Sequence, residues 1–374
     1  MNNSPLNQSP SHSPLPETIH RFSFTGTGGG YFPIWLTNLA LTVITLGIYG
    51  AWAKVRKERY FHEHTHLNGS SFEYTANPIS ILKGRLIVFG IFIIFAVTQT
   101  IPFVNIFVLL LLFIAAPKIV TQAIKFRARY TNYRNIPFRF SGTYGRTFIY
   151  FFLLRIPAVL TLGLLFPWVK HAERKYLVDN LGYGKTNFSF GASVKTFYKC
   201  YLSAAVFLLL PLTIFILRSL VATFFDVEKL PGTIENGLTP QSGSTILELI
   251  SGSVGAIALV ASFFVVFSVG IPLVKVLLAR ATWSNTSIGS FKVTYNLTFW
   301  SYVGVLVTNI LLLIVTLGLA APFCMVRLFK YKIDRLSISG PTSIDEFVNA
   351  RETELRAFGD EAADVYDLDI DFGL

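Results

Sequence analysis

Long apolar stretches, separated by short segments rich in Lys and Arg, run along most of the chain. A helix needs about 20 apolar residues to cross a bilayer. Seven stretches approach or exceed that length, at about 31–53, 85–101, 103–121, 148–168, 200–222, 246–276 and 300–323. Short runs of alternating aromatic and polar residues between them are typical of strands. The pattern predicts an all-α polytopic membrane protein with short cytoplasmic β-strand elements.

A recurring set of residues points to internal repeats. Thr-Leu-Gly occurs three times, and a large aromatic residue, a cation and a tyrosine follow each copy at the same distances. The repeat signature consists of Thr45, Gly47, Trp52, Tyr60, Thr161, Gly163, Trp168, Tyr176, Thr316, Gly318, Phe323 and Tyr331. Its aromatic residues are typical of an interfacial belt, with ligand stacking as the alternative. Two near-complete repeats and one partial repeat are expected.

The repeats and the composition divide the chain into five segments. These are a disordered N-terminal segment at 1–20, a first repeat unit at 21–121, a second at 122–277, a partial third at 278–345 and an acidic C-terminal tail at 346–374. The two terminal segments hold too little apolar surface to predict a core of their own.

The distribution of charge leaves two topologies open. If all seven apolar stretches cross, the basic loops at 54–84 and 170–199 lie on opposite sides, against the bias of basic loops for the cytoplasm. If the three Thr-Leu-Gly segments instead enter and leave on one side, both loops are cytoplasmic and the acidic loop at 226–248 is external. Charge favours four spans plus three re-entrant segments, while seven spans and the oligomeric state stay open.

Composition narrows the class of partner. Hydrophobic residues make up 52% of the chain and charged residues 14%, with a net charge of +11. Because the cations stand beside apolar stretches, anionic lipid headgroups of the bilayer are the expected partner, and nucleic acid is not. Only Cys200 and Cys324 are present, so no disulfide framework is expected.

Candidate binding residues are the cations at or near membrane depth. Arg155 lies inside an apolar run, where an ionisable side chain usually faces a partner, a cavity or a pathway; snorkelling to the interface is the alternative. Basic residues beside the repeated segments are further candidates for a solute or lipid headgroup: Arg56, Arg59, Arg174 and Lys175.

Metal binding and catalysis find little support in the sequence. His62, His64 and His66 would share one face of a strand, where three imidazoles could bind Zn²⁺; on a helix they would not converge. No arrangement of nucleophile, acid and base predicts an enzyme, and no cofactor is expected.

Several stretches together carry a family resemblance. They are Gly-Thr-Gly-Gly-Gly-Tyr-Phe at 26–32, Thr-Asn-Leu at 37–39, Thr-Leu-Gly-Ile-Tyr-Gly-Ala-Trp-Ala-Lys-Val-Arg-Lys-Glu-Arg-Tyr at 45–60 and Leu-Asn-Gly-x-x-Phe-x-Tyr at 67–74. Over about 20–345 the chain resembles the YjgN-like family of bacterial inner-membrane proteins. The resemblance implies a multi-pass protein of the bacterial inner membrane and brings no activity or substrate with it, because the function of that family is unknown.

Two functional hypotheses follow. The first is a membrane protein that binds or transports a small anionic or lipid-like solute, because duplicated units with broken apolar segments are common in transporters. The alternative is a non-transporting envelope or regulatory protein whose basic juxtamembrane helices bind anionic lipid or a cytoplasmic partner.

Overall fold

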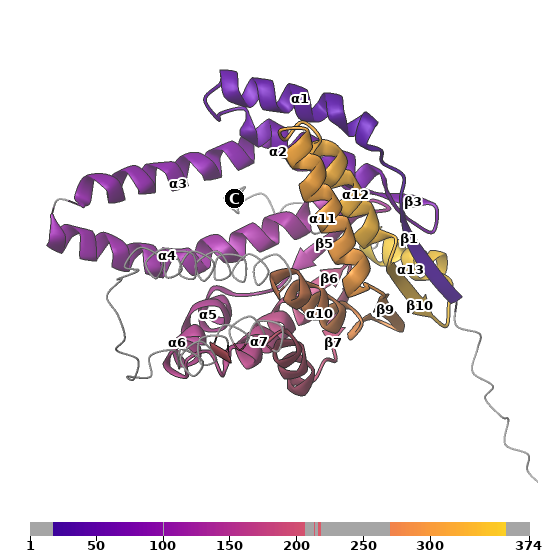
Figure 1. The fold of residues 1–374 in the computed structure, drawn as a ribbon. Helices are drawn as coiled ribbons and strands as arrows, with labels where there is room; N and C mark the ends of the chain where they lie inside the picture. Colours follow the sequence, from indigo (N-terminus) through magenta and orange to yellow (C-terminus); the bar gives the residue numbers. More distant parts are fainter. Residues whose placement is uncertain (1–17, 100, 206–212, 214–215, 218–269, 357–374) are drawn as a thin grey trace, which may run out of the picture.

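Ten antiparallel strands close a barrel in this computed structural model, which describes residues 18–99, 101–205, 213, 216–217 and 270–356 (Figure 1). The order around the barrel is β1-β10-β9-β8-β7-β6-β5-β4-β3-β2, and β1 closes it by pairing with both β2 and β10. The strands are β1 (Thr18–Phe24), β2 (Thr65–Leu67), β3 (Ser70–Tyr74), β4 (Thr131–Tyr133), β5 (Ile136–Phe140), β6 (Leu181–Tyr183), β7 (Thr186–Phe190), β8 (Thr286–Ile288), β9 (Phe291–Tyr295) and β10 (Leu336–Gly340).

The all-α fold expected from the sequence is therefore wrong. The short aromatic stretches are not isolated strands beside a helical bundle, because each pairs with strands of neighbouring segments until the sheet has no free edge. Closure removes the unpaired backbone groups that short, exposed strands would otherwise present. Pairing of Thr18 with Gly340 shows that strands from opposite ends of the sequence complete the sheet.

Helices connect the strands at one end of the barrel (Figure 1). Within the described residues, the strands β1, β3, β5 and β9 each lead into a helical hairpin that returns to the next strand, and these are the first, second, third and fifth connections in chain order. The fourth connection, between β7 and β8, lies mostly outside the described residues. The helices are α1 (Gly28–Ile44), α2 (Gly50–Glu63), α3 (Pro78–Thr98), α4 (Pro102–Arg129), α5 (Tyr144–Phe148), the π-helical η1 (Ile149–Leu153), α6 (Arg155–Leu160), α7 (Phe166–Asp179), α10 (Ile271–Trp283), α11 (Phe299–Val315), α12 (Ala321–Ile333) and α13 (Ile344–Arg356).

Thr-Leu-Gly forms the turn of the first, third and fifth hairpins. In the first, the amide of Gly47 donates to the carbonyl of Thr42 at 2.8 Å, which ends α1 as in a Schellman motif. The Thr45 hydroxyl then accepts from the amide of Tyr49 at 2.9 Å and so caps α2. The other two turns make the same bonds, Gly163 to Ala158 with Leu165 to Thr161, and Gly318 to Leu313 with Ala320 to Thr316. The repeated triplet thus encodes a helix reversal.

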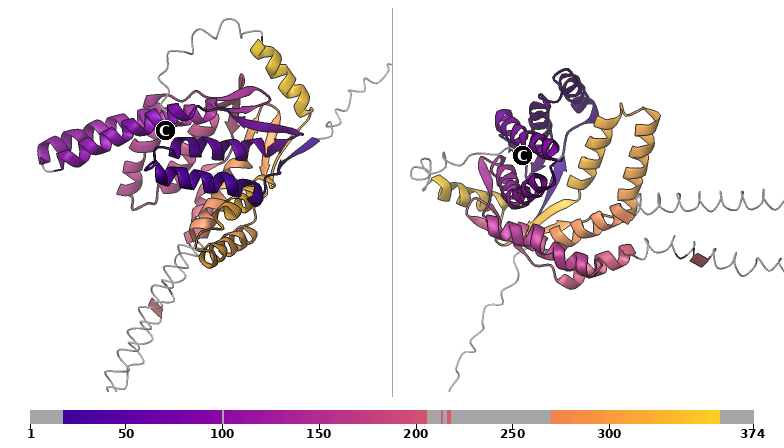
Figure 2. Two further views of the ribbon diagram at one scale, coloured as in Figure 1. Left: turned by 90° about the horizontal axis from the view of Figure 1, so that it is seen from above. Right: turned by 90° about the vertical axis from the view of Figure 1, so that its left-hand side faces the viewer.

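The second hairpin is longer than these. α3 and α4 lie side by side and extend well beyond the barrel (Figures 1 and 2). Among the described residues, these two helices are long and apolar enough to cross a membrane, with α11 a shorter apolar helix. The apolar stretches expected at 200–222 and 246–276 lie almost wholly outside the described residues.

The opposite end of the barrel holds the strand turns and α13. Asn68 and Gly69 both adopt positive φ in the β2–β3 turn, as a two-residue hairpin turn requires. α13 packs against this end through the buried side chains of Ile344 and Val348. The segment expected as an acidic tail at 346–374 thus begins inside a packed helix, and its residues 357–374, like 1–17 at the N-terminus, lie outside the described residues.

Candidate functional site

Arg155 is partnered by an acid in the structure. Its guanidinium Nη2 lies 3.8 Å from Glu173 Oε2, across the third hairpin from α6 to α7. The Glu173 side chain is buried and also accepts from the Lys170 ammonium at 2.9 Å. Because one buried carboxylate is shared by two cations, Arg155 is tied to the packing of its own hairpin.

The repeated cations bind neighbouring strands. Arg59 Nε donates to the carbonyl of Tyr74 at 3.4 Å, and Lys330 Nζ donates to the carbonyl of Phe24 at 2.8 Å, in each case at the end of the next long strand. Lys175 pairs with Asp179 at 2.8 Å, and Asp179 accepts from the amide of Phe190. These contacts join one unit to the next, so these cations support the barrel.

The other two cationic candidates differ from each other. Arg56 donates to the Tyr49 hydroxyl at 2.9 Å, beside the stacked rings of Tyr49 and Trp52 at the base of the first turn. Arg174 lies on α7 in electrostatic range of Tyr201. The structure does not bring either of them to Arg155 in one site.

The repeated tyrosines also make one shared contact. The hydroxyl of Tyr60 donates to the carbonyl of Thr27 at 2.8 Å, and those of Tyr176 and Tyr331 donate to Thr143 and Thr298 at 3.3 and 3.1 Å. Each bond joins the second helix of a hairpin to the start of its first helix. The large aromatics lie at the first turn of the second helices, with Trp168 and Phe323 exposed and Trp52 partly buried.

The three histidines do not lie on one strand. His62 belongs to α2, where its Nδ1 contacts the carbonyl of Glu58, and His64 ends that helix with Nδ1 on the carbonyl of Tyr60. His66 alone lies on β2. Within the part of the chain that the structure describes, no group of three His, Cys, Asp or Glu side chains is placed to hold a metal ion.

A cluster of cations that the sequence did not single out lies between the first two hairpins. Lys54 on α2 is partly buried and within electrostatic range of Arg85 on α3 and Arg127 on α4, with Glu58 as the nearby acid. The Arg85 guanidinium lies against Gly50, where an added Cβ would meet its Nη1 at 2.6 Å. None of the three cations forms an ion pair with a carboxylate of the described residues, which leaves the cluster with capacity for an external anion.

The barrel lumen is lined by five cross-strand pairs, one at each junction between a long strand and the short strand beside it. The pairs are Phe22 with Leu67, Phe72 with Tyr133, Phe138 with Tyr183, Phe188 with Ile288, and Val293 with Ile338. Consecutive phenylalanine rings stack at centroid distances of 6.0 to 6.5 Å and form a layer across the lumen. At β9, Val293 takes the place of a phenylalanine.

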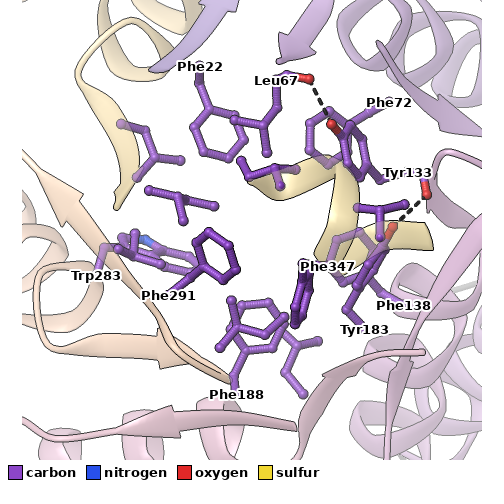
Figure 3. A pocket seen from close by; sticks show the side chains of 17 residues that line it. Phe22, Leu67, Phe72, Tyr133, Phe138, Tyr183, Phe188, Trp283, Phe291 and Phe347 are labelled. Carbon is purple, nitrogen blue, oxygen red and sulfur yellow. Dashed lines mark hydrogen bonds between the residues drawn. The ribbon is translucent and has the colours of Figure 1, made fainter. Parts of the chain in front are cut away.

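Below this phenylalanine layer is an apolar cavity of about 210 Å³ (Figure 3). Both tyrosine hydroxyls in its lining are already paired: the Tyr133 hydroxyl donates to the carbonyl of Leu67 at 2.7 Å, and the Tyr183 hydroxyl donates to the carbonyl of Tyr133 at 3.0 Å. Burial raises the pKa of both phenols, so they stay neutral across physiological pH. Phe347 of α13 also lines the cavity.

Such a cavity is costly when empty. Side chains that line an empty apolar space lose the dispersion contacts that close packing would give them. Water gains little there, because an apolar cavity offers it too few hydrogen bonds; an engineered cavity of about 150 Å³ stays dry and binds benzene. The lumen is therefore suited to an apolar occupant.

Above the phenylalanine layer lies a second cavity of about 350 Å³, here called the vestibule. It shares Phe22, Phe72 and Phe138 with the lumen, so the two cavities meet at the layer. Helices contribute polar side chains to the vestibule, among them His62 from α2 and Arg127 from α4. A path thus leads from the helical end of the barrel toward the lumen.

One signal in the sequence could have revealed the lumen. Each long strand ends in two inward-facing residues separated by one outward-facing residue, as in Phe22 and Phe24 or Phe138 and Phe140. This alternation recurs in the strands β1, β3, β5, β7 and β9, with Val293 in place of a phenylalanine in β9. Its recurrence in all five strands was the signal that they could share one sheet.

These features define a class: a closed barrel whose connections are helical hairpins with apolar surfaces. A family model described as "Bacterial protein of unknown function (DUF898)" matches residues 19–365. The chain belongs to this family, and the resemblance inferred from the sequence is confirmed. No solved structure matches the chain.

Curated relatives carry a membrane location in their names. The chain is 33% identical over 147 residues to "Inner membrane protein YjgN" of Salmonella typhimurium (strain LT2), which covers 39% of this chain and 37% of the relative. It is 31% identical over 150 residues to the protein of the same name from Escherichia coli (strain K12), covering 39% of this chain and 36% of the relative. The chain thus matches little more than a third of the length of these relatives. Their names support association of this chain with a lipid bilayer.

Proposed function

We propose that this chain is a multi-pass inner-membrane protein that binds anionic lipid through cations at the bases of its helical hairpins. The observation that carries the proposal is the exposure of the hairpin tips. Leu46, Leu162 and Leu317 are 94%, 96% and 93% exposed, each held at positive φ in the middle of a Thr-Leu-Gly turn. Three fully exposed leucines at the far ends of apolar hairpins fit a hydrocarbon environment.

Helix lengths separate two kinds of membrane segment. At 1.5 Å per residue, the 17 residues of α1 span about 25 Å and the 14 of α2 about 21 Å, less than the roughly 30 Å of a hydrocarbon core. The 21 residues of α3 and 28 of α4 are long enough to cross and return. The first, third and fifth hairpins would therefore be re-entrant, and the second would span.

This arrangement also agrees with the charge rule. Hairpins bring the chain back to the side from which it left, so the whole barrel and all basic segments beside it share one side of the membrane. The bias of Lys and Arg for the cytoplasm supports placing the barrel there. The five strand–hairpin–strand units would then be the internal repeat of the protein, with hairpins of two lengths.

The lipid headgroup site is the cluster of Lys54, Arg85 and Arg127. It lies between the first two hairpins, toward the barrel, where headgroups meet helices that leave a bilayer. Phosphate and carboxylate groups pair readily with guanidinium groups, and each cation near an anionic surface contributes about 1 kcal/mol. The cluster therefore favours binding of an anionic lipid.

Binding to nanodiscs of defined lipid composition tests this function. The double variant Arg85→Gln with Arg127→Gln should bind phosphatidylglycerol, measured by native mass spectrometry, about thirtyfold more weakly, because two cations that each contribute about 1 kcal/mol are lost. The matched control Lys185→Gln with Lys292→Gln removes the same charge from exposed positions on the barrel and should bind as the unmodified protein does. Equal retention of phosphatidylglycerol by both double variants would sink the proposal.

A further inference from the structure

We infer that the barrel lumen binds a single linear acyl chain whose anionic head lies at Arg127 in the vestibule. The inference deepens the proposed function and rests on it for the head group alone. The chain-binding part depends on the lumen, whose lining includes none of Lys54, Arg85 and Arg127.

The chemistry of the lining selects an apolar occupant. Around the cavity the side chains are aliphatic or aromatic, and its two tyrosine hydroxyls already donate to backbone carbonyls (Figure 3). A sugar, a nucleotide or an amino acid would leave its polar groups unpaired there, which is strongly unfavourable. A hydrocarbon chain has no polar groups to leave unpaired in the lumen, and it fills space that water fills poorly.

The shape of the lumen selects a single chain. Four stacked phenylalanine rings close most of the layer between lumen and vestibule, from Phe22 round to Phe188. On the remaining side stands Val293, paired with Ile338 and close to Trp283 in the cavity wall. Valine is smaller than phenylalanine, so the lumen keeps space beside Val293 that a fifth phenylalanine would occupy, and a space bounded in this way suits one chain.

The far end of the lumen is blocked. Ile344, Phe347 and Val348 of α13 enter the cavity from the turn end of the barrel. Asp345 holds the helix in place by an ion pair with Arg134 and by accepting a hydrogen bond from Asn68 at 2.9 Å. We therefore expect a chain to enter from the vestibule, which shares Phe22, Phe72 and Phe138 with the lumen.

The head group has one clear partner. Arg127 lines the vestibule, comes from the last turn of α4 and forms no ion pair with a carboxylate of the described residues. A carboxylate or phosphate at this guanidinium sits above the phenylalanine layer while its chain passes through to the lumen. Both a free fatty acid and a lysophospholipid have this chemistry.

The test uses the full-length protein in phosphatidylcholine nanodiscs with dansyl-labelled undecanoic acid as the fluorescent probe. Val293→Phe completes the phenylalanine layer with a side chain that the other four units already carry. It should weaken probe binding at least about tenfold, because the larger side chain occupies space in the lumen that the chain would fill. Ser189→Phe adds the same side chain to the exposed outer face of β7 and should leave binding unchanged. Ile338→Phe, opposite Val293, is a second filling variant in case the first does not fold.

Three further measurements separate the outcomes. Arg127→Gln should weaken binding of the acid probe but not of its methyl ester. This difference would show that Arg127 contacts the anionic head group. Displacement of the probe by myristate and by lysophosphatidylglycerol, compared side by side, identifies the source of the chain. Unchanged probe binding in both filling variants overturns the lumen site. If the lumen site is overturned in this way but phosphatidylglycerol binding still depends on Arg85, the proposed function holds without the lumen site.

Discussion

Three threonines each support two helices at once. Thr316 Oγ1 donates to the carbonyl of Leu312 at 2.6 Å at the end of α11 and accepts from the amide of Ala320 at 3.1 Å at the start of α12. A Schellman motif alone would end the first helix, but the second would then begin with an unsatisfied amide. The threonine hydroxyl accepts a hydrogen bond from that amide, so the second helix can begin only a few residues after the first one ends.

Replacing Thr316 by valine keeps the shape of the side chain and removes this cap. We expect Thr316→Val to lower the free energy of unfolding by about 1 kcal/mol, the usual value of a helix N-cap. Thr308→Val is the matched control, because the Thr308 hydroxyl donates only within α11, to the carbonyls of Gly304 and Val305. Thermal unfolding in detergent measures both, and equal losses would show that the turn does not depend on the hydroxyl.

Buried phenols make stability depend on alkaline pH. Burial raises the pKa of Tyr183 above its ordinary value of 10, and the neighbouring Tyr133 phenol raises it further. Above pH 10 these tyrosines ionise in the unfolded chain but stay neutral in the folded protein. Their contribution to the free energy of unfolding is therefore fully present below pH 10 and is lost as the pH rises toward the pKa of the folded state. Tyr74 and Tyr295, with a pKa raised to about 12 chiefly by burial, act in the same direction.

Tyr183→Phe tests this directly. The variant loses the bond from the hydroxyl to the carbonyl of Tyr133, so it should be less stable near pH 8 by about 1 kcal/mol. Because it has no group to ionise, its stability should fall less between pH 9 and 11, and the two denaturation midpoints should converge. A gap that stays constant or widens over this range would contradict a neutral, buried phenol.

Sequence patterns predicted some residue contacts better than others. The signature tyrosines recur at one spacing, and each makes the same hydrogen bond, because a helix of fixed length returns each of them to the same place. A solute site at Arg155 stays a prediction, and its ion pair with Glu173 was not foreseen, because Glu173 lies across a hairpin whose closure no local pattern reveals. Whether a cation forms an ion pair depends on the tertiary structure, and the spacing of residues along the sequence does not reveal it.

At the scale of elements, the helices followed from apolar runs and the barrel did not. Strands such as Thr65–Leu67 are three residues long, too short for alternation to stand out from chance. Their stability comes from pairing on both sides and from the lumen side chains, which are contributed by distant segments. A sequence shows the inward aromatic residues but not that five sets of them meet.

α13 shows a similar limit. Its acidic composition suggested a solvated tail, yet Ile344, Phe347 and Val348 stand at helical spacing and form the apolar face that covers the lumen. The spacing of these three apolar residues was the feature of the sequence that could have predicted a docked helix. Composition averaged over the whole segment hides it, because one narrow face is enough to dock a helix.

A charge on that face should detach the helix. Val348 is 2% exposed, so Val348→Asp places a carboxylate in an apolar contact and should favour an undocked α13. Trypsin cleavage after Arg351 should become at least about tenfold faster. Ala350→Asp puts the same charge on the exposed side of the helix and should cleave like the unmodified protein. Equal cleavage of the two variants would show that α13 is not held by its apolar face.

At the scale of the molecule, the barrel and the hairpins form two zones. The described strands gather in one barrel, from which the helices extend (Figure 2). The most exposed leucines, Leu46, Leu162 and Leu317, lie in the Thr-Leu-Gly turns between paired helices. Each described hairpin returns to the barrel that it left, so strands and hairpins build both zones together. The proposed function requires that the hairpins enter the membrane from the same side.

The most direct test of that orientation is cysteine labelling in cells. In a protein with Cys200→Ser and Cys324→Ser, single cysteines are placed on the barrel at Ser71 or Ser189 and on a hairpin tip at Leu162. We predict that an impermeant maleimide labels neither barrel position in intact cells and both once the membrane is opened. The tip should react only with a membrane-permeant reagent. Labelling of Ser189→Cys or Leu162→Cys from outside intact cells would contradict a barrel on one side with re-entrant hairpins.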